Sequence, residues 1–153
     1  MSVTDPAITA RQARLSTLAK APAARLCALF AAYAPDLPAH EMLRAPEIGT
    51  VMLRGRAGAK GAPFNLGEMT VTRCAVRLSS GAVGHGHVQG RDKDAARAAA
   101  LIDALCEDGQ VPAIEAAILA PLRAEAEALR QARATRAAAT KVEFFTMVRG
   151  DNA

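Results

Sequence analysis

Arginine is the residue type here whose chemistry is easiest to interpret. Arg54 and Arg56 lie two positions apart in one strand-like run, and Arg73 lies in a second. Residues two apart on a strand share a face, about 7 Å from each other. A guanidinium presents a planar set of N–H donors that matches the oxygens of phosphate or phosphonate. The sequence therefore offers Arg54, Arg56 and Arg73 as candidate anion-binding residues, with salt bridges inside this chain or to a partner as the alternative.

The positive charge is concentrated around these residues. Between residues 44 and 91, six Arg and one Lys face only Glu47 and Glu68, which leaves a net charge of +5. Residues 1–43 carry +1 and residues 92–153 carry −2, so the chain as a whole has +4. A basic region confined to strands favours an anionic partner.

The glycine-rich segment 58–67 could cradle an oxyanion with its backbone N–H groups. A phosphate loop, however, needs GxxxxGK followed by Ser or Thr and then a helix. Here Gly61 is followed by Ala62, Pro63 and a strand-like run. We interpret the segment as a hairpin or interface loop.

His85 and His87 are spaced to share one strand face and could ligate a metal. A third ligand is needed, and His40 falls in a separate loop, so we expect a polar sheet face and no metal site. Cys74 could pair with either histidine as a nucleophile, but its core-like neighbours favour a buried structural thiol. No residue is expected to be catalytic.

The elements before these strands are expected to be helical. Thr4 or Asp5 can cap a first helix that has Pro6 in its first turn, and a second helix is expected to begin at Pro22. A proline-rich stretch up to Pro46 should interrupt regular structure before the sheet.

Three antiparallel strands are expected, at residues 48–57, 68–78 and 82–89. The third places Gly84 and Gly86 on one face, where the missing side chains predict another element packed closely against it.

Two further helices follow the strands. Asp92 is expected to cap the first, which should close at Gly109. The second should begin at Pro112 and be kinked or broken near Ala120, because Pro121 removes a helical hydrogen bond.

The chain ends in KVEFFTMVRG, residues 141–150, which we expect to form a short strand docked on the sheet or on a partner. The fold class is therefore α+β in a single domain, with an N-terminal helical pair (1–43), antiparallel strands (44–91), helices (92–140) and a tail (141–153). The candidate residues for a subunit interface lie in this tail: Phe144, Phe145, Met147 and Arg149.

Composition points to a thin core. Of 153 residues 51% are hydrophobic but only 3% aromatic, with alanine supplying much of the apolar share. Alanine buries little area, so a partner surface is expected to complete the core. No signal peptide or membrane-spanning run is evident, and three widely spaced cysteines favour reduced thiols. We expect a cytoplasmic protein.

Four strings of the sequence resemble the PhnG family of phosphonate metabolism proteins. They are RAPEIGTVMLRGRAG, PFNLGEMTVTRCAVRL, GHVQGRDKDAA and VEFFTMVRG. The similarity runs over nearly the whole chain, and the loop departs from the family at Ala59-Lys60, where more glycine is expected.

The resemblance implies a G subunit of a bacterial carbon–phosphorus lyase core complex, assembled with H-, I- and J-type subunits in two copies each. With the H-, I- and L-type subunits it would support displacement of adenine from MgATP by an alkylphosphonate, giving a ribose 1-phosphonate 5-triphosphate. It implies no cofactor in this subunit and the I-type subunit as the nearest partner. The alternative is a small nucleic-acid-binding protein using the basic strands, which lack aromatic residues for base stacking.

Overall fold

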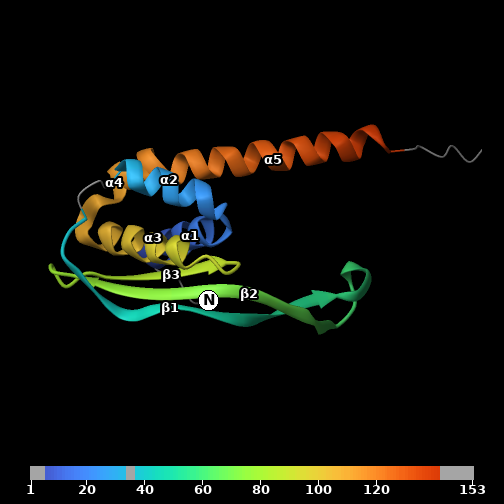
Figure 1. The fold of residues 1–153 in the computed structure, drawn as a ribbon. Coiled ribbons are helices and arrows are strands. Elements are labelled where there is room, and N and C mark those ends of the chain that lie inside the picture. The colour runs from blue at the N-terminus through green and yellow to red at the C-terminus, as the bar shows by residue number, and fades with distance from the viewer. Residues whose placement is uncertain (1–5, 34–36, 142–153) are drawn as a thin grey trace, which may run out of the picture.

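The computed structural model describes residues 6–33 and 37–141 and has an α+β fold. Three antiparallel strands form a sheet in the order β1-β2-β3, and helices stack on one of its faces (Figure 1). This arrangement confirms the expected fold class, whereas the expected strand at the chain end lies outside the described residues. The elements are α1 (Pro6–Lys20), α2 (Ala23–Tyr33), β1 (His40–Arg56), β2 (Pro63–Leu78), β3 (Val83–Gln89), α3 (Lys93–Leu105), α4 (Val111–Ile114) and α5 (Ala120–Ala139).

Strand β1 begins earlier than the sequence predicts. It starts at His40, eight residues before Ile48, and runs through Pro46. The pairing with β2 shifts register between Arg44 and Glu47, so Pro46 lies in an irregularity on an outer strand. Proline is tolerated at such bulges and edges because its missing N–H is not needed for a ladder hydrogen bond. The expectation that prolines end regular structure here was wrong for this reason.

Strand β2 is also longer than predicted, beginning at Pro63 and not at Glu68. The glycine-rich loop shrinks to a short connection that contains a 3₁₀ segment (Ala57–Ala59), with Gly58 at φ +56°. β1 and β2 therefore form one long hairpin, whose tip extends beyond α1, α2 and α3 (Figure 1).

The sheet and α3 approach each other closely at two glycines. A Cβ on Gly84 would lie 2.1 Å from the carbonyl oxygen of Ala100, and one on Gly86 would lie 2.0 Å from that of Ala96. Only glycine allows this spacing, since real Cβ atoms do not come within 3.0 Å of such neighbours. The prediction of a closely packed element on this face of β3 is confirmed.

Helix α3 is the centre of the core. Asp92 caps it as predicted, accepting a hydrogen bond of 2.8 Å from the N–H of Ala95. Most of its residues are buried, and it packs between the sheet and α2 (Figure 1). After Leu105 a wide π-helical turn follows, in which Gly109 has φ +93°, the left-handed conformation expected at the end of the helix.

A buried ion-pair network ties α1 to the end of α3 and to β3. Asp103 is fully buried and accepts hydrogen bonds from Arg11 (2.7 Å), Arg14 (2.9 and 3.2 Å) and the backbone N–H of His85 (3.0 Å). Glu107 joins both arginines at the surface, at 2.6 and 3.2 Å. Burial alone would lower the pKa of Arg14, but the hydrogen bonds and charges of Asp103 and Glu107 outweigh it and raise the pKa.

The last helix is interrupted where Pro121 predicts. A π-helical turn, Glu115–Leu119, separates α4 from α5, and the N–H of Ala120 donates to the carbonyl of Glu115. From 126 to 139 every residue of α5 is exposed, and the helix projects from the body (Figure 1). Among the described helices none alone has the length and apolar character to cross a membrane; α1 and α2 meet the criterion only as a pair, bent by 118°.

Candidate functional site

The sheet face opposite the helices carries the polar side chains that the sequence singled out. On β2 the exposed residues Arg73 and Arg77 alternate with Thr72, Cys74 and Val76, which are buried toward the helices. Pairing places His87 beside Arg73 and His85 beside Ala75. Strand alternation therefore places Arg73 and Arg77 on the open face, together with Ala75, while Cys74 and Val76 face the helices.

Arg44 and Arg73 meet at one carboxylate on this face. Arg73 donates a hydrogen bond of 2.7 Å to Oε1 of Glu47, and Arg44 donates to the same oxygen. Two cations on one anion leave an excess of one positive charge. Each guanidinium has five N–H donors, so most of them remain for another acceptor.

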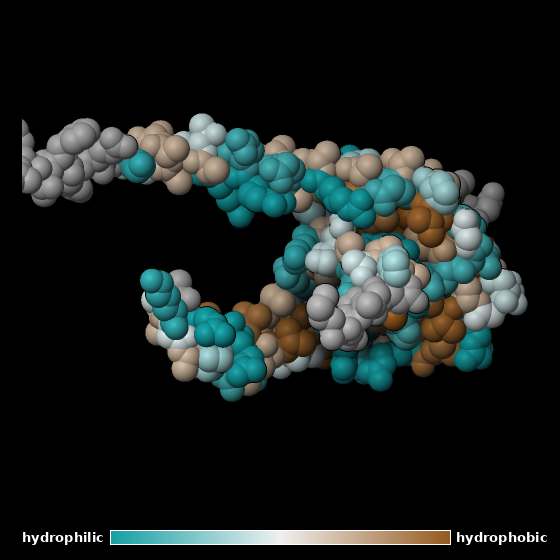
Figure 2. All heavy atoms as spheres, turned by 180° about the vertical axis from the view of Figure 1, so that it is seen from behind, coloured by the Kyte–Doolittle hydropathy of each residue, from teal (hydrophilic) through white to brown (hydrophobic). Residues whose placement is uncertain are grey.

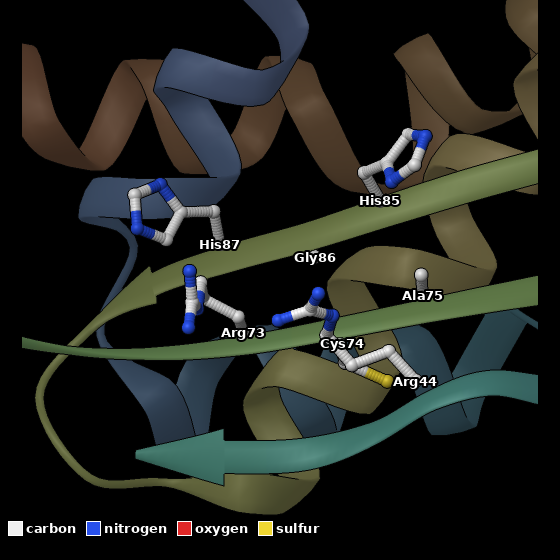
Figure 3. Close-up of a pocket in the computed structure, with 7 residues that line it drawn as sticks. All are labelled: Arg44, Arg73, Cys74, Ala75, His85, Gly86 and His87. Atoms are coloured by element: carbon white, nitrogen blue, oxygen red, sulfur yellow. The ribbon is translucent and has the colours of Figure 1, made fainter. Parts of the chain in front are cut away.

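The histidines stand next to this pair. Figure 3 shows the imidazole of His87 near Arg73, while that of His85 lies farther along β3; both histidines and both arginines line a pocket of about 340 Å³. Arg73 and His87 are directly opposed on neighbouring strands, in a pair where side chains approach closely. In the described part of the chain neither imidazole has a hydrogen-bond partner, so both are available to an acceptor. The pocket is lined by Arg44, Arg73, Cys74, Ala75, His85, Gly86 and His87.

Arg54 and Arg56 lie elsewhere, at the hairpin tip. With Gly55 and Pro63 they line a second, more open hollow. Arg56 donates a hydrogen bond of 3.1 Å to the carbonyl of Gly61, whereas Arg54 has no ion pair within the described residues. Because Arg56 pairs with Pro63, ten residues along β2 separate this hollow from Arg73, or roughly 30 Å.

The structure thus divides the three predicted anion-binding arginines between two places. Arg73 belongs to the sheet-face pocket, while Arg54 and Arg56 form a separate pair. The alternative interpretation, intramolecular salt bridges, holds for Arg73 with Glu47 and for Arg77 with Glu41 at 3.0 Å. Exposed pairs of this kind stabilise a fold by only about 0–1 kcal/mol, so they can exchange for a ligand or a partner.

The cysteines are placed as structural thiols. Cys74 is buried on the helix side of β2, and burial raises its pKa. Burial also raises the pKa of Cys106 to about 11 and, more weakly, that of Cys27. A thiol must ionise to act as a nucleophile, so these environments work against reactivity. Over residues 6–33 and 37–141, no three His, Cys, Asp or Glu side chains are grouped to hold a metal ion.

The hairpin around these sites is apolar as well as basic. Of the exposed large hydrophobic residues, most lie on β1 and β2, and Figure 2 shows brown side chains along the hairpin, across an open space from the α5 arm. Phe64 is 45% and Leu66 66% exposed. An exposed apolar surface of this extent is typical of an interface. It comprises Met42, Leu43, Ile48, Met52, Leu53, Phe64 and Leu66.

Two functional features escape the sequence reasoning. The first is the role of Arg44 and Glu47 in the pocket, hidden because the register shift near Pro46 cannot be read from alternation. The second is the Arg11–Arg14–Asp103–Glu107 network. The sequence does contain a pattern that could have indicated this network: two basic residues spaced i, i+3 in one helix and two acidic residues spaced i, i+4 in another helical segment.

Comparison with known proteins identifies relatives along almost the whole chain. The family model described as "Phosphonate metabolism protein PhnG" matches residues 9–150. A curated relative from Rhizobium meliloti (strain 1021), alpha-D-ribose 1-methylphosphonate 5-triphosphate synthase subunit PhnG, is 43% identical over 148 residues. The match covers 97% of this chain and 94% of the relative. Neither comparison supports a nucleic-acid-binding protein.

Proposed function

Because the chain belongs to the PhnG family of phosphonate metabolism proteins, we propose that it is a non-autonomous subunit of an alpha-D-ribose 1-methylphosphonate 5-triphosphate synthase. The observation that carries the proposal is 43% identity to such a subunit over 97% of the chain. The product defines the reaction: a phosphonate oxygen replaces adenine at ribose carbon 1 of ATP, while the triphosphate stays on carbon 5. MgATP is then a substrate of the complex, and this subunit holds no cofactor. A cytoplasmic location, where ATP is available, completes the proposal.

A supporting role fits the chemistry of the open sheet face. Departure of adenine calls for a positioned proton donor. Glu41 and Glu47, the acids on the paired part of β1, are each held in an ion pair with arginine. The proposal therefore assigns the bond-breaking step to another subunit, the I-type subunit being the nearest partner. H-, J- and L-type subunits complete the set, with two copies of this chain per core complex.

The test of this role is assembly. We expect the chain, co-expressed with the companion subunits, to copurify in a complex whose native mass contains two copies of it. That complex should convert MgATP and methylphosphonate to the ribose 1-methylphosphonate 5-triphosphate and adenine. A wild-type chain that stays monomeric in the presence of every companion contradicts the proposal.

A second role is binding of the anionic substrate by the sheet-face pocket. Arg44 and Arg73 share Glu47, and the adjacent imidazoles of His85 and His87 are free to add donors. Four such groups around one hollow match the oxygens of a phosphonate or triphosphate. The same argument applies more weakly to Arg54 and Arg56 at the tip, where only guanidinium groups converge.

Replacement of single arginines in the assembled complex tests this second role. We expect Arg73→Gln to raise the KM for methylphosphonate or MgATP about tenfold, the value of one charged hydrogen bond. Arg77→Gln is the matched control, because Arg77 lies on the same strand face and is also ion-paired, but outside the pocket. Arg54→Gln and Arg56→Gln are measured alongside. Equal KM values for all the variants and wild type remove the anion-binding role.

A further inference from the structure

The two edges of the sheet differ in their backbone hydrogen bonding. On β3 two of the outward groups are capped: Arg11 donates to the carbonyl of Val83 at 3.2 Å, and the N–H of His85 donates to Asp103 at 3.0 Å. These contacts cover the first half of the outer edge of β3 (Val83–Gln89). β1 is the opposite edge, and its outward backbone groups have no such contact with any residue that the structure describes.

The register identifies which groups of β1 face outward. The carbonyl of Thr70 accepts from the N–H of Gly90, so the backbone groups of Thr70 point toward β3. Thr70 is the partner of Thr50, and in an antiparallel ladder such a pair has its N–H and C=O groups turned away from each other. Thr50 consequently points its backbone groups away from the sheet. By alternation the same holds for Ile48 and Met52, and none of these outward groups has a partner within the described residues.

The open edge has natural limits. It begins after the register shift between Arg44 and Glu47, and it ends at the shift between Leu53 and Arg54. Within these limits Ile48, Thr50 and Met52 offer three N–H donors and three C=O acceptors. An added strand of about five residues would satisfy them at the usual spacing.

The surroundings of the edge define the chemistry of what binds there. Ile48 and Met52, which belong to the exposed apolar surface of the hairpin, are 48% and 53% exposed. Between residues 48 and 67 there are two Arg and one Lys but no Asp or Glu. Arg54 has no ion pair among the described residues, so the hairpin tip carries a positive charge that no described carboxylate neutralises. The positive charge of the tip favours acidic residues in the bound segment, and the exposed side chains of Ile48 and Met52 favour apolar residues in the same segment.

We propose that the outer edge of β1, from Ile48 to Met52, binds an extended segment of another subunit as an added antiparallel or parallel strand. The segment combines apolar residues with acidic residues that lie against Arg54 and its neighbours. This mode of contact uses main-chain hydrogen bonds for affinity and side chains for specificity. The inference rests on the proposed function, because it takes the occupant from the same synthase.

Thr50→Pro tests the added strand, with Thr50→Ala as its matched control. Proline removes the outward N–H of Thr50 but none of the hydrogen bonds to β2, and an edge strand accepts it. Alanine removes only the side chain. We expect Thr50→Pro to weaken association with the companion subunits at least tenfold, with Thr50→Ala within about twofold of wild type. Association is measured by titration of the companion complex with the purified chain.

Arg54→Glu supplies a second variant that does not disturb the backbone, since Arg54 is exposed and has no described partner. Facing an acidic segment, it should also lose about tenfold in affinity, and Arg54→Gln should lose less. Wild-type affinity in Thr50→Pro, or in Arg54→Glu, overturns the inference while leaving the subunit role in place. Failure of the wild-type chain to associate with any companion subunit overturns both.

Discussion

The two sides of one small sheet are built differently. At β3 the carbonyl of Val83 and the N–H of His85 are capped by Arg11 and Asp103, and glycines let α3 lie directly against the strand. At β1 no residue is buried, apolar side chains are exposed, and the outer edge has no strand paired with it among the described residues. The β3 side, packed against α1 and α3 of the same chain, is here called the complete side. The β1 side, with its exposed apolar residues, resembles a protein interface and is called the open side. This contrast explains how a folded subunit can still depend on partners.

The largest expected effect lies on the complete side. Asp103→Ala leaves the buried Arg14 without its main partner and the N–H of His85 without an acceptor. Removing one member of a buried ion pair typically costs about 3–5 kcal/mol of unfolding free energy. Urea denaturation of the isolated chain measures the loss. Asp108→Ala, at an exposed aspartate nearby, should change stability by less than about 0.5 kcal/mol. A loss below about 1 kcal/mol for Asp103→Ala contradicts the assignment of this network to the core.

The same glycine substitution made on both sides sharpens the comparison. Gly84→Ala would place a Cβ against the backbone of α3, so we expect a loss of about 2–3 kcal/mol in unfolding free energy. Gly49→Ala, on β1, meets nothing within 4 Å and should change it by less than about 0.5 kcal/mol. Thermal or urea unfolding of the two variants provides the measurement. Equal losses would mean that β1 is packed as tightly as β3.

On the open side the expected effect is on association and not on folding. Leu66→Ser should leave the free chain within about 0.5 kcal/mol of wild type, because Leu66 is 66% exposed. In the complex it should weaken binding about tenfold, as expected for an apolar interface residue. Ile8→Ser is the control, at a comparably exposed residue (52%) on α1, away from the hairpin. If both variants bind equally well, the hairpin is not the interface.

The smallest effect concerns the thiol at the end of α3. Burial raises the pKa of Cys106 to about 11 from an ordinary value of 9.0. The folded state then binds more protons than the unfolded state between these values, so the free energy of unfolding falls as pH rises from 9 through 11. Native protein at pH 8 should react with iodoacetamide at Cys106 far more slowly than protein unfolded in guanidinium. Comparable rates contradict the buried, protonated thiol.

The sequence predicts the complete side better than the open one. Alternation and glycine placement identify β3 and its packing against a helix, and Asp92 marks the start of α3. These signals are local, and the packing agrees with them. The length of β1 was missed because Pro46 is a strand breaker except at an edge bulge, and edge position is a property of the whole sheet.

The candidate sites, too, are predicted from the sequence only where local patterns are sufficient. The types of Arg54, Arg56 and Arg73 indicate anion chemistry, and strand alternation in the structure places Arg73 on the open face. Their grouping depends on register and distance along the hairpin, which separate Arg73 from the other two by roughly 30 Å. The proximity of Arg44 to Arg73 depends on a register shift that no local pattern indicates. The tail residues Phe144, Phe145, Met147 and Arg149 lie outside the described residues, and their interface role stays a prediction.

Amide hydrogen exchange at the two sheet edges tests the central claim most directly. The account predicts that the amide of His85 on β3 is protected in the free chain and remains so in the assembled complex. The amides of Thr50 and Met52 on β1 should exchange rapidly in the free chain and at least tenfold more slowly in the complex. Exchange at Thr50 and Met52 that is equally fast in both states, or already slow in the free chain, would contradict a sheet completed by another subunit.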